Sequence, residues 1–544
     1  MEKKKKSGFM VQGGILAAAG LITRFIGMLY RIPLTRIVGK EGMGYYNNSY
    51  EIYNIALLIS CYSVPVAVSK LIADKEGKGE YVNSSRYFRF ALILSSSIGL
   101  TVSLLVFIFA PQIAEAFKYP SCVIPLRVLT PTIFVFSIMG VIRGFFQGKH
   151  TMVPTALSQI IEQVINAVVS VVAAAYLINA FKDLNEAAAY GAAGGTAGTL
   201  AGAMAALVFL VILLFLYRKK VDKSEAIDIT GKKDESKFII KALLFTMMPI
   251  ILSQTIYQVS GIIDSYIFSN FMNKHGYTET ERSIFWEAYS NRYKWMYNVP
   301  VAIASAFGVS IVPALSSSYA KNDTEGIKKK IASAVKFNML IAFPAAMGLG
   351  FLSQPILVLL LGDVTDNLGP RLLSLGCMAV VFFALSTLTN GVLQGINMMR
   401  KPVTHSLIAL IIHIIAVFIG LNTFESENGV YIMVICNMLY GLLVCALNWW
   451  SIAKALNYKQ EIKRTFLLPA ICALLMGVVT DYTYEFVYGY TYSMAVALIP
   501  AFIVAVLVYA VLILLTKTVT EDELLEMPMG KKIVRILKKI RLIR

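Results

Sequence analysis

Charged residues are scarce in this chain of 544 residues, in which Asp, Glu, Lys and Arg together make up only 15%. A soluble globular protein carries roughly 25%. The four histidines and six cysteines show no CxxC or metal-ligand spacing, so we expect no zinc or disulfide framework and no cofactor. The sequence also lacks a Walker A motif and any grouping of catalytic side chains. We therefore expect neither direct use of ATP nor an enzyme.

Apolar residues dominate the chain, at 57% of its length. At about 22 apolar residues per crossing, this content suffices for about fourteen membrane spans. The first two apolar runs are Gly8–Ile37 and Gly42–Ala73. Runs of this length differ from the short alternating strands of an outer-membrane barrel and exclude it. The sequence predicts an all-α polytopic membrane protein with about 14 transmembrane helices.

The basic excess of +18 is distributed in a pattern rather than gathered in one domain. With the N-terminus placed in the cytoplasm, the inside loops carry most Lys and Arg, and the outside loops carry mainly Asp and Glu. This alternation follows the positive-inside rule and predicts that both termini are cytoplasmic. Because no basic domain is present, we expect no nucleic-acid partner.

A repeat divides the chain into two similar lobes. Gly144-x-x-Gln147-Gly148 recurs as Gly391-x-x-Gln394-Gly395, and Tyr45 and Asn47 recur as Tyr289 and Asn291 at nearly the same offset. Two pseudo-symmetric six-helix lobes around a central cleft are a transporter arrangement. The predicted parts are an N-lobe (1–217), a cytoplasmic linker (218–237), a C-lobe (238–454), two C-terminal helices (455–517) and an amphipathic basic cytoplasmic tail (518–544).

Several ionisable or amide side chains lie within the predicted spans, where a charge costs a few kcal/mol and marks a candidate functional site. Arg24 and Arg31 are seven residues apart and share one helix face. The arginine fork is the donor that best matches phosphate or carboxylate. The candidate substrate-binding residues are Arg24, Arg31, Asn47, Glu51, Asn291 and Arg292, and the candidate ion-coupling residues are Asp264 and Glu162.

Structural roles remain open for three of these residues. Glu51 has the charge to neutralise Arg24 or Arg31 as a structural pair, and Asp264 and Glu162 can equally join neighbouring helices. The glycines of the sixth span, from Gly191 to Gly202, form a stripe of small residues that predicts close helix packing.

Short motifs, taken in their order and spacing, carry a family resemblance that covers essentially the whole chain. They are Thr23-Arg24-Phe25-Ile26-Gly27 with Arg31, Arg36-Ile37-Val38-Gly39, Ser290-Asn291-Arg292, Pro300 and Ile311-Val312-Pro313-Ala314-Leu315-Ser316. With these motifs the chain resembles the multidrug/oligosaccharidyl-lipid/polysaccharide flippase superfamily, and within it the stage V sporulation protein B and lipid II flippase branch.

The resemblance implies a bacterial cytoplasmic-membrane flippase that moves an undecaprenyl-pyrophosphate-linked cell-wall precursor, lipid II or a related oligosaccharide, by alternating access. It implies a cationic cavity with Arg24, Arg31 and Arg292, and a groove for the lipid tail at the last two spans. The implied partners are the anionic lipid-linked glycan, membrane lipids and a coupling Na+ or H+. The lipid II flippases carry an arginine further into the second span, where this chain has Leu58-Ile59-Ser60-Cys61. A drug/cation antiporter and a non-transporting assembly factor are the alternatives.

Overall fold

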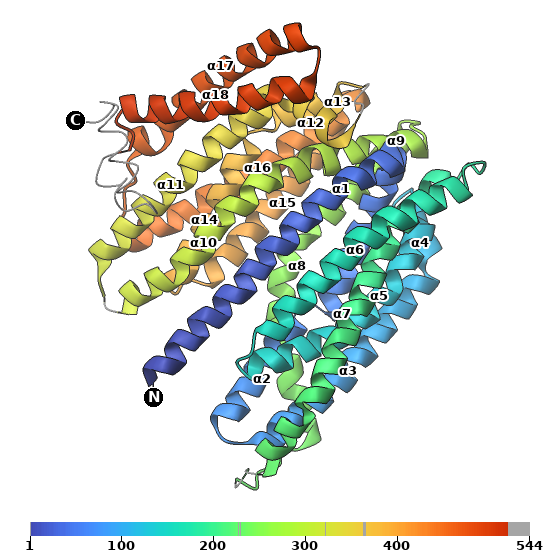
Figure 1. The fold of residues 1–544 in the computed structure, drawn as a ribbon, viewed down its shortest axis with the longest axis vertical. Coiled ribbons are helices and arrows are strands. Elements are labelled where there is room, and N and C mark those ends of the chain that lie inside the picture. Colours follow the sequence, from blue (N-terminus) through green and yellow to red (C-terminus); the bar gives the residue numbers. More distant parts are fainter. Residues whose placement is uncertain are drawn as a thin grey trace. The chain divides into compact units, whose positions relative to one another are not determined.

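The computed structural model describes residues 2–61, 63–226, 228, 230–320, 322–362 and 366–519. Within these residues the chain is helical and contains no strand (Figure 1). The predicted amphipathic tail lies almost wholly outside the described residues, which end at residue 519. The chain forms two compact units, Met1–Glu287 and Ala288–Arg544.

The first unit contains nine α-helices among its described residues. They are α1 (Glu2–Ser60), α2 (Val64–Gly77), α3 (Tyr81–Ile108), α4 (Ala110–Ala116), α5 (Val123–Gly148), α6 (Val153–Ala180), α7 (Ala187–Ala226), α8 (Ser236–Lys274) and α9 (Glu279–Glu287). Helix α8, which the sequence predicts for the second lobe, packs here against α1, α2 and α3. The unit boundary thus follows α9, and the predicted assignment of spans to lobes stays a prediction.

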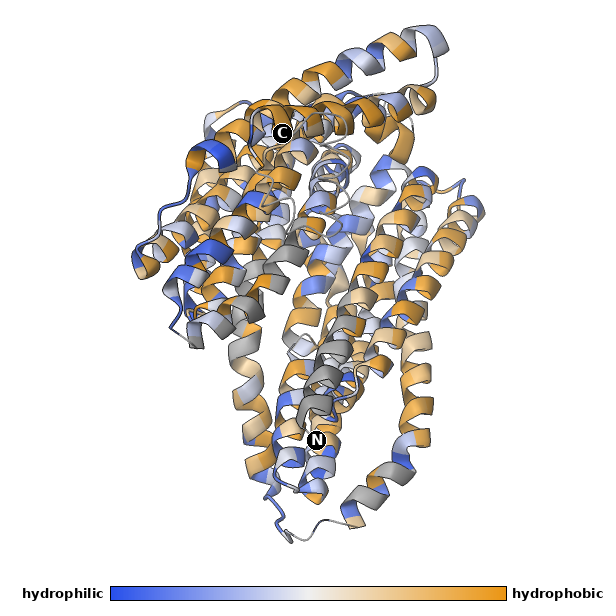
Figure 2. Cartoon of the chain, turned by 60° about the vertical axis from the view of Figure 1, so that its left-hand side comes forward, coloured by the Kyte–Doolittle hydropathy of each residue, from blue (hydrophilic) through white to orange (hydrophobic). Residues whose placement is uncertain are grey.

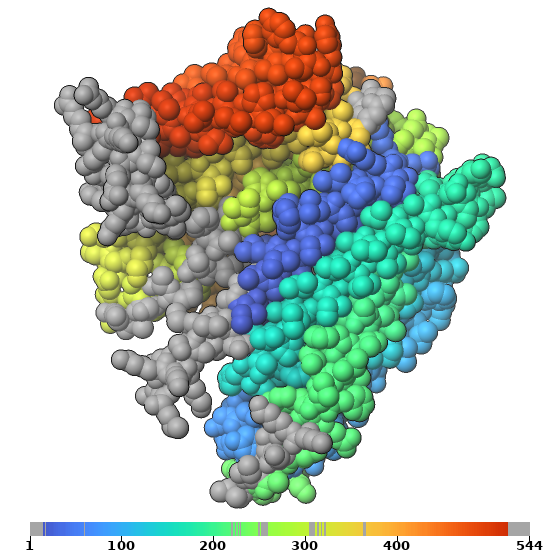
Figure 3. Space-filling model, in the orientation of Figure 1, coloured from blue at the N-terminus to red at the C-terminus, as the bar shows by residue number. Residues whose placement is uncertain are grey.

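The second unit begins with a π-helix, η2 (Ala288–Trp295). Its α-helices are α10 (Met296–Ala320), α11 (Thr324–Phe351), α12 (Ser353–Leu361), α13 (Leu368–Leu375), α14 (Ala379–Gly395), α15 (Arg400–Thr423), α16 (Gly429–Leu456), α17 (Leu468–Thr491) and α18 (Met494–Leu515). Helices α17 and α18 pack side by side (Figure 1), and together they form a continuous red surface in Figure 3.

Nine helices of the described residues are long and apolar enough to cross a membrane, and a tenth span results when the bent pair α13 and α14 is counted as one. Orange, which marks hydrophobic residues, covers much of the helical ribbon in Figure 2. Helices α1, α8 and α10 are not among the nine. The multi-pass helical class is confirmed, whereas the predicted count of fourteen spans is not.

Helix α1 is a helical hairpin in which two helical stretches meet at Gly39. A straight helix of its 59 residues would be about 90 Å long, roughly three times the hydrocarbon thickness of a bilayer. Gly39 has φ 73° and ψ 177°, a backbone conformation that glycine adopts without steric cost. The chain therefore reverses where the sequence predicts the boundary between its first two spans.

Glycines of α7 allow it to pack closely on α6. A Cβ at Gly194 would lie 2.5 Å from the Ala174 backbone, and one at Gly198 would meet Ser170. Gly202 similarly lies against the carbonyl of Glu162. These contacts confirm the predicted packing role of the glycine stripe, which leaves no room for a side chain at the interface.

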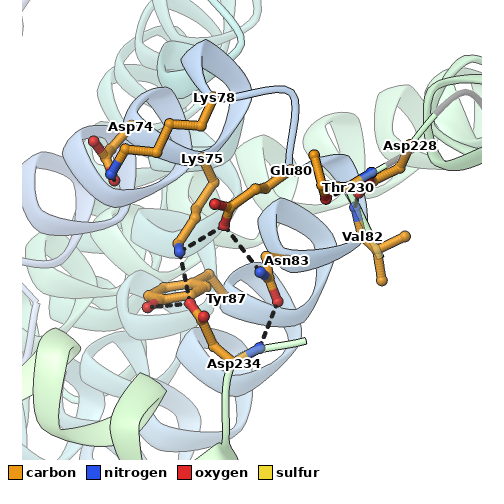
Figure 4. A network of polar contacts seen from close by, with 10 residues as sticks. All are labelled: Asp74, Lys75, Lys78, Glu80, Val82, Asn83, Tyr87, Asp228, Thr230 and Asp234. Carbon is orange, nitrogen blue, oxygen red and sulfur yellow. Dashed lines mark hydrogen bonds and ion pairs between the residues drawn. The ribbon is translucent and has the colours of Figure 1, made fainter. Parts of the chain in front are cut away.

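The segment after α7 is bound to the α2–α3 corner. Lys75 Nζ lies 2.8 Å from Glu80 Oε2 and 2.6 Å from Asp234 Oδ2, and Tyr87 donates a hydrogen bond to Asp234 (Figure 4). Asp234 N donates to Asn83 Oδ1 at 2.9 Å, and Asp228 accepts from Val82 N at 2.8 Å. Much of the predicted linker (218–237) is therefore either the C-terminal part of α7 or chain that is held against α2 and α3.

Candidate functional site

The hairpin of α1 brings Arg31 and Asn47 together. These residues lie equally far before and after Gly39, and Arg31 Nη2 donates to Asn47 Oδ1 at 3.1 Å. In a straight helix they would be about 24 Å apart. Tyr30 and Tyr46 directly precede Arg31 and Asn47 in the sequence, and their hydroxyls share a hydrogen bond of 3.2 Å. The hairpin therefore places the candidate residues Arg31 and Asn47 in contact in the first unit, and their role in binding substrate stays a prediction.

Among the described residues, the Arg31 guanidinium is oriented by an aromatic ring and a neutral amide. Its Cζ lies 5.7 Å from the centre of the Tyr46 ring, within the range of a cation–π contact. Asn47 is a neutral amide, so its hydrogen bond leaves the positive charge in place. The Arg31 side chain is half-buried, and Arg24, two turns earlier, is exposed.

Helix α8 faces the second half of the hairpin with polar groups. Ser265 Oγ donates to Asn48 Oδ1 at 2.6 Å. A Cβ at Gly261 would lie 2.7 Å from Glu51 Oε2, so the glycine allows the Glu51 carboxylate to approach the α8 backbone. Asp264 lies one position before Ser265 and is 2% exposed. Two predicted acidic site residues thus lie on packed helices at the same level of the first unit.

Glu162 is held by an arginine that the sequence analysis did not select. Arg143 Nη2 donates to Glu162 Oε2 at 2.8 Å, and Arg143 Nε donates to Ser158 Oγ at 2.9 Å. Arg143 is only 9% exposed. Its position directly before the Gly144 motif, within an apolar run, was the available signal. This geometry favours the helix-joining role that the sequence left open for Glu162.

In the second unit, Arg292 is buried and bound to a carboxylate. It lies in η2, is 2% exposed, and its Nη1 donates to Asp366 Oδ1 at 2.7 Å. A Cβ at Gly369 would collide with the Arg292 side chain, so α13 packs directly on it. Asn291, next to it, is fully buried. Arg31 and Arg292 belong to different units, and a cavity shared by both stays a prediction.

The cluster around Lys75 shows how charged groups outside the spans affect one another. Hydrogen bonding from Lys75 holds the pKa of Glu80 below its ordinary value. For Asp234 burial acts upward, but hydrogen bonds from Lys75 and Tyr87 keep its pKa below the ordinary value. Burial of the Lys75 ammonium acts to lower its pKa. The hydrogen bonds to Asp234 and Glu80 outweigh this effect, and the pKa of Lys75 is raised above its ordinary value. All three groups are therefore charged at neutral pH.

Long apolar helices, together with arginines and carboxylates placed within them, define a multi-pass membrane protein of the transporter class. A family model described as polysaccharide biosynthesis protein matches residues 11–319, more than half of the chain, and one described as MatE matches residues 296–419. The chain belongs to the polysaccharide biosynthesis protein family. The resemblance to the multidrug/oligosaccharidyl-lipid/polysaccharide flippase superfamily, which the sequence predicts, is confirmed.

Two relatives from Bacillus subtilis (strain 168) are similar over nearly the whole chain. Lipid II flippase MurJ is 24% identical over 91% of this chain and 92% of its own. Stage V sporulation protein B is 26% identical over 97% and 100%. Among solved structures, the lipid II flippase MurJ in an inward closed conformation has a TM-score of 0.67, at 16% identity over 91% of this chain and 97% of its own. An inward-facing MATE family transporter has a TM-score of 0.64, at 18% identity over 79% and 95%.

Proposed function

We propose that this protein is a flippase that moves a lipid-linked cell-wall precursor across the bacterial cytoplasmic membrane by alternating access, with both termini in the cytoplasm. The observation that carries the proposal is the Arg31 guanidinium, which is half-buried within the hairpin and bonded to a neutral amide. Similarity to a lipid II flippase over nearly the full length supports lipid II or a related pyrophosphate-linked glycan as the substrate.

The pyrophosphate group would bind Arg31, with Asn47 orienting the guanidinium and Tyr46 supporting its face. A charge-assisted hydrogen bond of this kind contributes about 1.5–3 kcal/mol. Arg24, on the same helix face and exposed, is the proposed second contact along the path. Arg292 and Asn291 complete the proposed set only if the pair with Asp366 opens during the cycle.

Glu51 and Asp264 are the proposed ion-coupling groups. They lie on packed helices, and Gly261 gives the Glu51 carboxylate space beside α8. Carboxylates inside membrane helices are characteristic of ion pathways and proton relays in transporters. We assign Glu162 to joining helices, because it forms an ion pair with Arg143 at 2.8 Å.

The test is translocation of fluorescent lipid II by the purified protein in proteoliposomes, followed by the accessibility of the label at the outer surface. Arg31→Gln should slow translocation at least tenfold, because it removes the charge but keeps the polar volume. Arg127→Gln, at an exposed arginine of α5, is the matched control and should transport normally. A wild-type protein that leaves lipid II unmoved but exports cationic dyes would replace the flippase proposal with the antiporter.

A further inference from the structure

A pocket lies within the second unit, and Arg292 is not among the residues that line it. It has a volume of about 560 Å³ and is bounded by α12, α13 and α17. That volume falls within the roughly 300–1,000 Å³ of small-molecule sites. In the predicted topology, the α12–α13 segment and the end of α17 lie on the outer side of the membrane.

Helix α17 contributes acceptors and an aromatic surface to this pocket. Asp481 and Glu485 lie one turn apart, and Tyr484 and Tyr488 follow the same spacing. The two tyrosine rings are stacked, with centroids 5.7 Å apart and planes at 12°. Helix α17 is apolar enough to span a membrane, and carboxylates are rare in such helices unless they serve a function.

The opposite wall contributes donors and hydroxyl groups. Arg371 of α13 lines the pocket with up to five N–H donors. The hydroxyls of Ser353 and Ser374 lie 2.8 Å apart, and Ser374 Oγ donates to Gly350 O at 2.7 Å, which fixes this wall. Acceptors, donors and flat aromatic surface therefore converge on one space.

This combination matches a saccharide better than the other ligand classes. Sugar hydroxyls both donate and accept hydrogen bonds, and the C–H face of a pyranose ring packs on aromatic rings. The carboxylates of Asp481 and Glu485 would repel an anionic ligand. The described residues contain no group of three His, Cys, Asp or Glu side chains placed to hold a metal ion.

We propose that the α12–α13–α17 pocket is an external saccharide-binding site that receives the sugar part of the translocated lipid-linked glycan. The identity of the occupant rests on the proposed flippase function, whereas the saccharide chemistry rests on the pocket itself. The carboxylates of Asp481 and Glu485 would accept hydrogen bonds from sugar hydroxyls, Arg371 would donate hydrogen bonds to sugar oxygens, and Tyr488 would pack against the sugar ring.

The test measures binding of the soluble disaccharide N,N′-diacetylchitobiose to the full-length protein in nanodiscs by saturation-transfer NMR. Tyr488→Leu and Asp481→Asn should each weaken binding at least tenfold, and Tyr488→Phe, which keeps the ring, should bind within about threefold of wild type. Tyr490→Leu is the matched control, because Tyr490 is an exposed tyrosine of the same helix that does not line the pocket.

Absence of saturable binding, equal binding by all variants, or displacement by a polyamine but not by a second sugar would overturn the proposal. Lipid II translocation is measured on the same preparations. A protein that translocates lipid II without binding the disaccharide removes this site and leaves the flippase intact. Binding without translocation retains the saccharide site and overturns the flippase function.

Discussion

The hairpin of α1 and the π-helix η2 each hold an arginine that the sequence assigns to the same role, and their surroundings differ. Arg31 is half-buried and hydrogen-bonded to the neutral Asn47. Arg292 is 2% exposed and ion-paired with Asp366. An arginine with a neutral partner keeps its charge available to an anion, whereas one bound to a carboxylate must first exchange that partner. We therefore expect the partner, more than the depth, to decide which of the two proposed arginines is available to substrate in this conformation.

The largest effect should come from removing the partner of Arg292. Asp366→Ala leaves a guanidinium buried without its carboxylate, which costs about 3–5 kcal/mol for a fully buried pair. Because the Asp366 side chain is 34% exposed, we expect about 2–3 kcal/mol and a lowered Tm in detergent. Glu325→Ala, in the exposed Lys328–Glu325 pair, is the control and should leave Tm unchanged.

The double variant Arg292→Met with Asp366→Leu sharpens the same comparison. Replacing an ion pair by apolar residues of similar volume is often neutral for stability. Since the Arg292 side of the pair is buried, we expect the double variant to recover most of the lost Tm. If the pair opens during the cycle, as the proposed binding set requires, translocation of lipid II by the double variant should stay below that of wild type. Wild-type translocation at a recovered Tm would instead restrict Arg292 to a structural role.

The next effect concerns the rigidity of the hairpin that presents Arg31. A Cβ at Gly44 would collide with the Ser283 backbone of α9, and backbone atoms cannot move aside cheaply. Gly44→Ala should therefore destabilise the protein by about 2 kcal/mol, within the range of overpacking substitutions, and lower its Tm. Gly20→Ala, at a glycine of the same helix with open space around it, should not. Equal Tm values for the two variants would show that this contact is not tight.

The two arginines also show what could be predicted from sequence. Long apolar runs predict helices, and the gap between Gly8–Ile37 and Gly42–Ala73 predicts the reversal that Gly39 makes. The partner of Arg292 lies 74 residues away and that of Arg143 lies 19 residues away. Such pairs depend on how helices pack, which helical periodicity does not encode. The sequence therefore predicts some of the buried charges, such as Arg292, but not Arg143 and not the partner of either.

A smaller effect should separate the charge of Arg31 from its shape. Arg31→Lys keeps the positive charge but loses the planar fork and its contact with the Tyr46 ring. We expect about tenfold weaker lipid II binding, equivalent to about 1.4 kcal/mol, with an unchanged Tm. The measurement is the substrate concentration that gives half-maximal translocation. Full activity of the lysine variant would mean that Arg31 acts as a point charge only.

The smallest effect lies outside the spans, where Lys75 holds Asp234 and Glu80 (Figure 4). Lys75→Ala should weaken the attachment of the Asp234 segment to α2 and α3 by about 1 kcal/mol. The amides of that segment should then exchange with deuterium roughly fivefold faster. Lys78→Ala, which removes an exposed pair with Asp74, is the control and should not change the exchange rate.

The same cluster predicts a dependence on pH. The folded-state pKa values of Asp234 and Glu80 lie below their ordinary values of 3.8 and 4.5. Their stabilisation is therefore complete above those values and is lost as the pH falls through the lowered pKa values. For Lys75, whose pKa is raised above 10.5, the stabilisation is complete below that value and is lost as the pH rises through the raised pKa. Protection of the segment, corrected for intrinsic exchange, should thus be constant between about pH 5 and 10. A decline near pH 7 would mean that another group, rather than these three, secures the segment.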